Sequence, residues 1–144
     1  MNRLWEEYVF VTLQKYCKKE CPDIEVSAQQ TKRFINSNYL RPDIVITDKN
    51  SDKVFVIDTK WKVPENSSVS ISDLRQIYTY ARFWKAEKVM LLYPGNRTSE
   101  SFKHFENEKD DPMHQCKLGF VSVLDSNNKL DISIREKIIN QLEF

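Results

Sequence analysis

Two stretches of the chain carry side chains that could hold a divalent cation beside a phosphate ester. Arg41-Pro42-Asp43 is followed, after fourteen residues, by Asp58-Thr59-Lys60. Carboxylate oxygens are ligands that Mg²⁺ prefers. A bound Mg²⁺ polarises a phosphodiester oxygen and lowers the pKa of a bound water, and a lysine can orient that water or offset developing charge. The pattern therefore indicates metal-assisted hydrolysis, although an acid-x-lysine triplet alone also fits an exposed ion pair at a strand end.

The elements expected around these residues would bring them together. Residues 39–47 and 53–61 are rich in β-branched and aromatic side chains, which predicts two strands joined by a polar hairpin loop. Alternation along the second strand puts Asp58 and Lys60 on the same face. In an antiparallel hairpin the start of one strand lies beside the end of the other, so we expect Asp43 to meet them there.

A predicted helix over residues 3–19 carries a further candidate acid. Its broad apolar face comprises Leu4, Trp5, Tyr8, Val9, Val11, Thr12 and Tyr16. Glu6 is the candidate on this helix, and Glu7 is an alternative that the pattern leaves open. For either residue, a solvated charge on the helix surface is the simpler interpretation.

A second predicted helix follows the lysine strand. Ser70 or Ser72 is expected to cap it, and its apolar spacing extends to about residue 85. Gln76 and Tyr80 are four residues apart and so share a face. An amide at this position could orient a phosphate or a metal-bound water, and ordinary amphipathic packing is the alternative.

The other predicted elements complete an α/β fold. They are a strand at 24–28, an apolar strand at 88–93, a surface loop at 96–112 with a helical turn near 102–105, a strand at 118–124 and a helix at 131–142. The strand–helix–strand passage from residue 53 to residue 93 predicts a parallel crossover. We therefore expect a mixed β-sheet flanked by helices, as a single domain over residues 1–144.

Composition excludes several classes of protein. The 22 Lys and Arg against 21 Asp and Glu give a net charge of +1, which argues against nucleic-acid binding by bulk electrostatics alone. Gly95 and Gly119 are the only glycines, so neither a P-loop nor a dinucleotide-binding fingerprint is present. No apolar run approaches the ~20 residues that cross a bilayer. The odd set of three cysteines predicts reduced thiols and a cytoplasmic location.

The motifs together resemble the PD-(D/E)xK nuclease superfamily and, more narrowly, the nuclease domain of the McrC family, the cleavage subunits of McrBC modification-dependent restriction systems. The matching runs are Leu4–Val9, Leu40–Ile46, Val56–Lys62, Asp73–Ala81 and Leu91–Pro94. Trp5 stands where the family usually has Phe. Agreement in order, spacing and element type is more specific than any single motif.

The resemblance implies a restriction-endonuclease-like fold and a Mg²⁺-dependent DNA endonuclease, in which Mn²⁺ can replace Mg²⁺. It implies Asp43, Asp58, Glu6 and the Thr59 carbonyl as metal ligands, Lys60 as the catalytic lysine and Gln76 as a supporting residue, with Tyr80 completing a Gln-x-x-x-Tyr element. It also implies a partner, a GTP-driven McrB-type AAA+ motor that brings DNA to this domain. A double-strand cut would need two such sites, which favours a dimer on DNA.

Other hypotheses remain open at this stage. A non-catalytic DNA-binding or assembly module could keep the nuclease fold, but such a module is expected to lack one catalytic position and this sequence lacks none. The chain begins almost at the Glu6 helix, without the region through which McrC-type subunits engage their motor, so an excised domain and a stand-alone relative with another partner both fit. No recognition helix or methylcytosine pocket can be inferred from the sequence.

Overall fold

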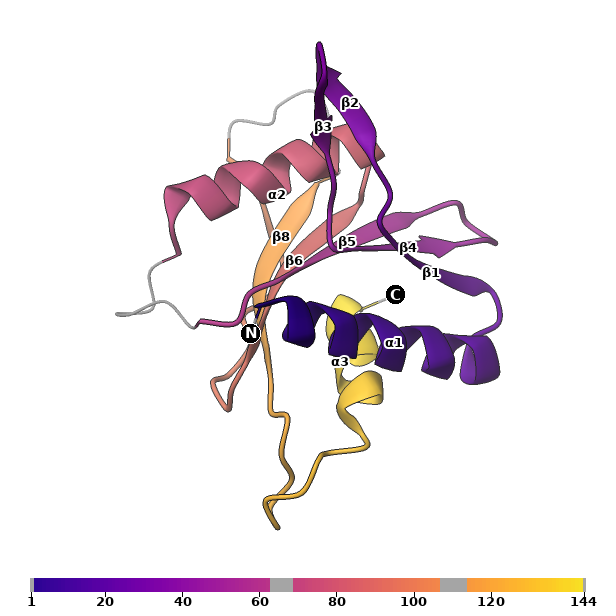
Figure 1. Cartoon of the computed structure of the whole chain (residues 1–144), viewed down its shortest axis with the longest axis vertical. Helices are drawn as coiled ribbons and strands as arrows, with labels where there is room; N and C mark the ends of the chain where they lie inside the picture. The colour runs from indigo at the N-terminus through magenta and orange to yellow at the C-terminus, as the bar shows by residue number, and fades with distance from the viewer. Residues whose placement is uncertain (1, 63–68, 107–113, 144) are drawn as a thin grey trace.

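The computed structural model describes residues 2–62, 69–106 and 114–143. Within them, six strands form a mixed sheet in the order β1-β4-β5-β6-β8-β7, and β2 and β3 form a separate hairpin. The elements are α1 (Asn2–Glu20), β1 (Ile24–Ala28), β2 (Lys32–Ile35), β3 (Asn38–Leu40), β4 (Ile44–Asp48), β5 (Val54–Thr59), α2 (Ile71–Trp84), β6 (Lys88–Pro94), β7 (Lys103–His104), β8 (Gln115–Val121) and α3 (Ile134–Leu142). Helices α1 and α3 lie on one face of the sheet and α2 lies on the other (Figure 1). The predicted α/β fold is confirmed.

The central strands are buried on both faces. Phe55 and Ile57 of β5 pack into the core beneath α1 and α3, whereas Val56 packs into the core beneath α2. Strands covered by helices on both sides are expected to be almost continuously apolar. A charged side chain at the end of such a strand therefore interrupts an otherwise apolar layer.

The strand pairing matches the two predicted connections. β4 and β5 are antiparallel, with Ile44 opposite Ile57. β5 and β6 are parallel, with Thr59 opposite Leu92, and α2 lies between them in the chain. Both the hairpin and the parallel crossover are therefore confirmed, and the carboxyl end of β5 lies beside that of β6.

Helix α1 buries a narrower face than the sequence predicts. Its buried side chains recur about once per turn, at Trp5, Val9, Leu13 and Cys17. Leu4 and Val11 are exposed, so their prediction as part of the apolar face is wrong. A helix that lies on a sheet covers mainly one stripe, and apolar residues beside that stripe stay at the surface.

Helix α2 has well-defined ends. The Ser70 hydroxyl accepts a hydrogen bond of 3.0 Å from the backbone N–H of Asp73, so Ser70 and not Ser72 is the N-cap. Lys85 ends the helix in the left-handed conformation, with φ of 51°.

Some predicted boundaries are wrong. The strand expected over residues 39–47 is split at Arg41-Pro42-Asp43, because proline lacks the N–H that a ladder requires. Instead of a helical turn near residues 102–105, the short strand β7 pairs with β8. Residues 107–112 of the predicted loop lie outside the described residues. Strand β8 starts and ends three residues earlier than predicted, and α3 starts three residues later.

The cysteines and the lengths of the helices can also be compared with the sequence. Cys17, Cys21 and Cys116 are all free thiols, as predicted. Among the described residues, no helix combines the length and apolar character needed to span a membrane.

Candidate active site

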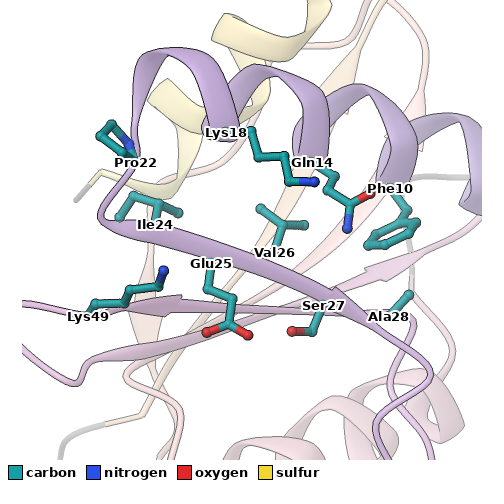
Figure 2. A pocket seen from close by; sticks show the side chains of 10 residues that line it. All are labelled: Phe10, Gln14, Lys18, Pro22, Ile24, Glu25, Val26, Ser27, Ala28 and Lys49. Atoms are coloured by element: carbon teal, nitrogen blue, oxygen red, sulfur yellow. The ribbon is translucent and has the colours of Figure 1, made fainter.

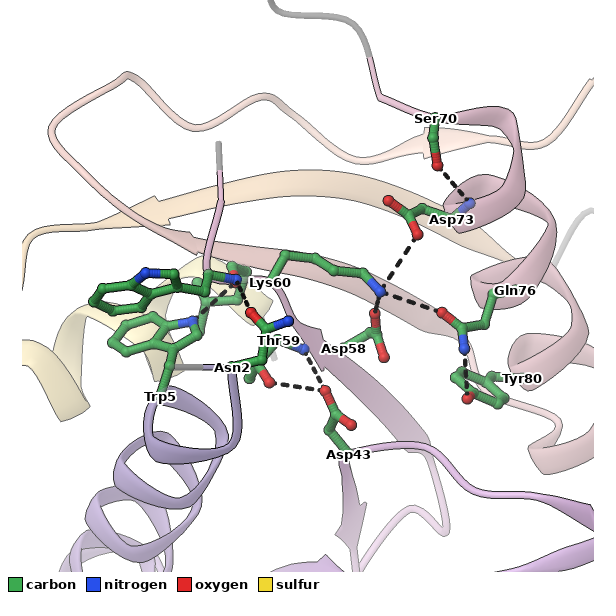
Figure 3. A network of polar contacts seen from close by, with 12 residues as sticks. Asn2, Trp5, Asp43, Asp58, Thr59, Lys60, Ser70, Asp73, Gln76 and Tyr80 are labelled. Atoms are coloured by element: carbon green, nitrogen blue, oxygen red, sulfur yellow. Dashed lines mark hydrogen bonds and ion pairs between the residues drawn. The ribbon is translucent and has the colours of Figure 1, made fainter. Parts of the chain in front are cut away.

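Hydrogen bonds between Asp43 and Thr59 join the start of β4 to the end of β5. Asp43 comes one residue before β4, so continuing the register of the hairpin places it opposite Asp58. Its Oδ2 accepts hydrogen bonds from the Thr59 backbone N–H at 2.7 Å and from the Thr59 hydroxyl at 2.8 Å (Figure 3). These bonds fix the Asp43 carboxylate beside the end of β5.

Asp58 is a buried carboxylate at the end of an apolar strand. Only 3% of the residue is exposed. Its Oδ2 forms an ion pair of 2.8 Å with Lys60 Nζ but accepts no hydrogen bond of regular geometry from the described residues. Burial raises the pKa of Asp58 to about 7, and the negative charge of Asp43 adds to this effect, while Lys60 opposes it. Asp58 is therefore held beside a second acid in a site that disfavours the charge of Asp58.

Lys60 links this pair of acids to helix α2. Its Nζ lies 2.8 Å from Asp58, 3.4 Å from an Asp73 carboxylate oxygen and 3.4 Å from the amide oxygen of Gln76 (Figure 3). Burial lowers the pKa of Lys60, but the contacts with Asp58 and Asp73 outweigh burial and the net shift is upward. Lys60 is therefore an ammonium ion at neutral pH.

Gln76 is held from the other side by Tyr80. The Gln76 amide nitrogen donates to the Tyr80 hydroxyl at 3.1 Å, and that hydroxyl donates to the Arg41 carbonyl oxygen at 3.2 Å. Tyr80 is buried against the sheet, while Gln76 is exposed. The chain of bonds fixes the Gln76 oxygen toward Lys60 and ties α2 to the segment that carries Asp43.

The first turns of α1 are tied to the same end of the sheet. The Trp5 indole N–H donates to the Leu92 carbonyl oxygen at 3.3 Å, and the Asn2 side-chain oxygen accepts from the Trp61 backbone N–H at 3.1 Å. The backbone N–H of Lys60 also donates to the Leu92 oxygen at 2.9 Å. These bonds place the residue after Trp5 beside the site.

Glu6 is that residue, and its environment distinguishes it from Glu7. Burial raises the pKa of Glu6, and the negative charge of Asp43 raises it further, whereas Arg41 and Arg3 oppose the shift. Glu7 is exposed. Glu6, which is half-buried and affected by the charge of Asp43, is therefore the stronger candidate of the two.

The oxygen atoms at this site suit a hard divalent cation, although they do not already surround a metal position. Among the described residues, no three His, Cys, Asp or Glu side chains already converge closely enough to hold a metal ion. Asp43 is bonded to Thr59, and Asp58 is paired with Lys60. Even so, the buried carboxylate of Asp58 lies next to a second carboxylate, and this arrangement fits Mg²⁺ because a divalent cation would add to the charge of Lys60 in relieving the repulsion.

Two polar groups at this site were not assigned a role from the sequence. Asp73 is a second ion-pair partner of Lys60, and its spacing from Gln76 on one helix face was a usable signal. Tyr93 of β6 has a buried hydroxyl without a hydrogen-bond partner among the described residues. Burial raises its pKa to about 12, and the charge of Asp73 adds to the shift.

A separate groove lies between α1 and the edge strand β1 (Figure 2). It has a volume of about 610 Å³ and contains none of the residues described above; it is lined by Phe10, Gln14, Lys18, Pro22, Ile24, Glu25, Val26, Ser27, Ala28 and Lys49. Its charged side chains, Lys18, Glu25 and Lys49, come from α1, β1 and the turn after β4, and no ion pair joins them among the described residues. The candidate site is therefore the cluster at the ends of β4 and β5.

Comparison with known proteins shows the family of this chain. The sequence model of the McrBC 5-methylcytosine restriction system component family matches residues 1–94, a span that includes Glu6, Asp43, Asp58, Lys60 and Gln76. The chain belongs to this family. None of the curated protein sequences matches this McrBC-family chain.

The fold of this McrBC-family chain is similar to part of a solved structure that contains McrC. It is similar to a chain of the refined half-complex from the tetradecameric assembly of Thermococcus gammatolerans McrB AAA+ hexamers with bound McrC, with a TM-score of 0.72 and 18% identity. The match covers 99% of this chain and 33% of that chain, so this chain spans about a third of the length of its structural relative.

Proposed function

We propose that this chain is the nuclease domain of an McrC-like restriction subunit and hydrolyses phosphodiester bonds of DNA in the presence of Mg²⁺. The observation that carries the proposal is the buried Asp58, ion-paired to Lys60 at 2.8 Å, with Asp43 beside it at the ends of two paired strands. A buried acid with a raised pKa and a specific charged partner is typical of functional sites.

Four groups would hold the cation. Asp43 and Asp58 supply carboxylate oxygens, Thr59 supplies its backbone carbonyl, and Glu6 completes the set from α1. A bound Mg²⁺ supplies charge neutralisation at the phosphate and makes a water more acidic. Mn²⁺ is expected to replace Mg²⁺ because it accepts the same oxygen ligands.

Lys60 would act as a fixed cation and not as a base. Its pKa is raised by Asp58 and Asp73, so its proton stays on Nζ at the pH of the cell. An ammonium ion at this position stabilises the negative charge that grows on the phosphate oxygens in the transition state. Gln76, held by Tyr80, keeps the lysine side chain directed at the site.

The reaction consumes one water for each bond cut. The water oxygen bonds to phosphorus, the bond from phosphorus to the 3′ oxygen breaks, and that oxygen takes up a proton. The products are a 5′-phosphate and a 3′-hydroxyl. The proton that the attacking water gives up passes to the solvent.

The partner that we propose is an McrB-type AAA+ motor driven by GTP. The structural relative of this chain belongs to an assembly of McrB hexamers with bound McrC. A net charge of +1 also supports loading by another protein, because the domain has little overall attraction for DNA. Two copies of the site, as in a dimer on DNA, would cut both strands.

The proposal is tested with an end-labelled DNA duplex incubated with the protein and Mg²⁺ or with EDTA. We expect cuts that need Mg²⁺ and leave 5′-phosphates, which ligase can rejoin. Binding of the duplex without any cleavage, with and without the motor and GTP, would instead identify a non-catalytic module.

Replacing Glu6 and Glu7 separately distinguishes their roles. Glu6→Gln is expected to slow Mg²⁺-dependent cleavage by about 10- to 100-fold, because the variant loses a carboxylate next to Asp43. Glu7→Gln removes the same charge one residue later, from an exposed position, and is the matched control. Cleavage rates of the two variants are compared at saturating Mg²⁺. Equal losses in both would show that the helix contributes only its overall charge.

A further inference from the structure

The β2–β3 hairpin stands away from the six-stranded sheet. It projects beside the end of α2 (Figure 1), and its strands pair antiparallel, with Arg33 opposite Tyr39. Asn36, in the turn, has a φ of 52°, which a tight hairpin turn requires. All four residues of β2 are exposed. An isolated two-stranded hairpin is only marginally stable in water, so other contacts must hold it.

One side of the hairpin is anchored to the C-terminal end of α2. Lys32 Nζ donates to the Phe83 carbonyl oxygen at 2.8 Å and lies 5.0 Å from the centre of the Trp84 ring. The Phe34 and Phe83 rings are 5.3 Å apart. These contacts hold the hairpin in a defined position against the end of α2.

The hairpin also carries side chains that no other part of the described chain covers. The Arg33 guanidinium lies 5.9 Å from the centre of the Tyr39 ring, and one of its nitrogens is 3.5 Å from the Tyr39 hydroxyl. Tyr39 and Ile35 are both 57% exposed. Large exposed apolar and aromatic side chains that gather on one projection mark an interaction surface.

The charge of this region differs from that of the whole chain. Residues 26–42 contain three basic side chains, Lys32, Arg33 and Arg41, and no acidic one, although the chain as a whole is nearly neutral. A local excess of positive charge next to aromatic rings favours a polyanionic partner.

The hairpin is continuous with the candidate active site. Only Arg41 and Pro42 separate β3 from Asp43. A groove of about 730 Å³ runs from the first turns of α1 to the base of the hairpin; it is lined by Asn2, Arg3, Glu6, Glu7, Phe10, Val11, Ala28, Gln29 and Arg41. A polyanion bound along this groove would pass both Glu6 and the hairpin.

We propose that the β2–β3 hairpin is an arm that contacts duplex DNA beside the cleavage site, with Arg33 and Tyr39 on its contact surface. The inference rests on the proposed nuclease function and specifies how its substrate is held. A two-stranded β-ribbon fits the major groove of DNA, and arginine and tyrosine side chains are among the groups that bind DNA phosphates. Lys32 serves instead to anchor the arm to α2.

The test is binding of a fluorescent DNA duplex, measured by anisotropy with Ca²⁺ in place of Mg²⁺ so that no cleavage interferes. Arg33→Gln is expected to weaken binding on the order of tenfold at low salt and to reduce the salt dependence by about one phosphate contact. Tyr39→Ala is expected to weaken binding without changing that salt dependence. Lys129→Gln removes one charge from an exposed position in the segment between β8 and α3, which lies at the opposite end of the molecule from the hairpin (Figure 1), and should bind as the wild type does.

A second measurement separates this inference from the proposed function. Hydrolysis of bis(p-nitrophenyl) phosphate with Mg²⁺ needs the candidate active site, but this substrate is too small to reach the arm. Arg33→Gln should therefore retain this hydrolysis. If the wild type binds the duplex through the arm but hydrolyses neither the DNA nor bis(p-nitrophenyl) phosphate, the inference about the arm is correct and the proposed nuclease function is wrong. Three outcomes would each overturn the DNA-contacting role of the arm. The first is wild-type affinity for the duplex in both folded arm variants, and the second is no duplex binding by the wild type at low salt. The third is that the arm variants lose only the binding of a protein partner.

Discussion

Asp58→Asn is expected to reduce DNA cleavage by at least about 10³-fold, because it removes a proposed metal ligand from the buried end of β5. The same substitution is expected to make the metal-free protein more stable above pH 7. An amide has nearly the shape of a carboxylate but carries no charge, so it avoids the cost of burying a second acid beside Asp43.

The direction of the pH dependence follows from the raised pKa of Asp58. In the unfolded chain this carboxyl loses its proton near its ordinary pKa of 3.8, whereas in the folded protein it holds the proton up to about pH 7. Between these values the folded state binds more protons than the unfolded state, so the free energy of unfolding falls as the pH rises. The destabilisation caused by the buried charge of Asp58 is complete above pH 7 and is absent below pH 4.

Thermal unfolding in EDTA at pH 5 and pH 8 measures this effect. Asp58→Asn should raise the free energy of unfolding on the order of 1–3 kcal/mol at pH 8 and by less at pH 5. Asp23→Asn, at an exposed position after α1, is the matched control and should follow the wild type at both pH values. If Asp58→Asn is less stable than the wild type at pH 8, the ion pair with Lys60 outweighs the cost of burial.

Lys60→Gln is expected to lower kcat for cleavage by about 10²- to 10⁴-fold while the domain stays folded. Lys60 is the only described cation that contacts Asp58, Asp73 and Gln76 together, so its loss removes the charge that would stabilise the transition state. Binding of Ca²⁺, measured by calorimetry, should be as strong as in the wild type or stronger, because the removed charge is positive.

Lys62→Gln is the matched control for this lysine. It removes the same charge two residues later, from an exposed position, so it should alter cleavage by less than about threefold. Equal losses for Lys60→Gln and Lys62→Gln would mean that the region acts through its overall charge. Loss of Ca²⁺ binding in Lys60→Gln would mean that Lys60 only holds the acids in place.

The convergence of Asp43, Asp58 and Lys60 was predictable because it depends on two local rules. Side chains alternate along a strand, and an antiparallel hairpin places the start of one strand beside the end of the other. The Gln76–Tyr80 pair follows from helical spacing in the same way. Each of these relations is fixed by residues close together in the sequence.

Other features depend on contacts between distant segments and were not predictable. The β2–β3 hairpin is short and its strands are exposed, and it is held by Lys32 and Phe34 against Phe83, some fifty residues away. The choice between Glu6 and Glu7 depends on how α1 rotates against the sheet, which the bond from Trp5 to Leu92 sets. The apolar residues of α1 cover a wider face than the stripe that is buried in the structure. Their pattern in the sequence could therefore not predict how the helix is rotated against the sheet.

The central claim, that the Asp58 site cuts DNA with Mg²⁺, is tested most directly with supercoiled plasmid. The wild-type chain and Asp58→Asn are each combined with an McrB-type motor and GTP, in Mg²⁺ and in EDTA, after association with the motor is verified for both. We predict nicked and linear plasmid only for the wild type in Mg²⁺. Equal cleavage by Asp58→Asn, or cleavage by the wild type in EDTA, would contradict the assignment of this site.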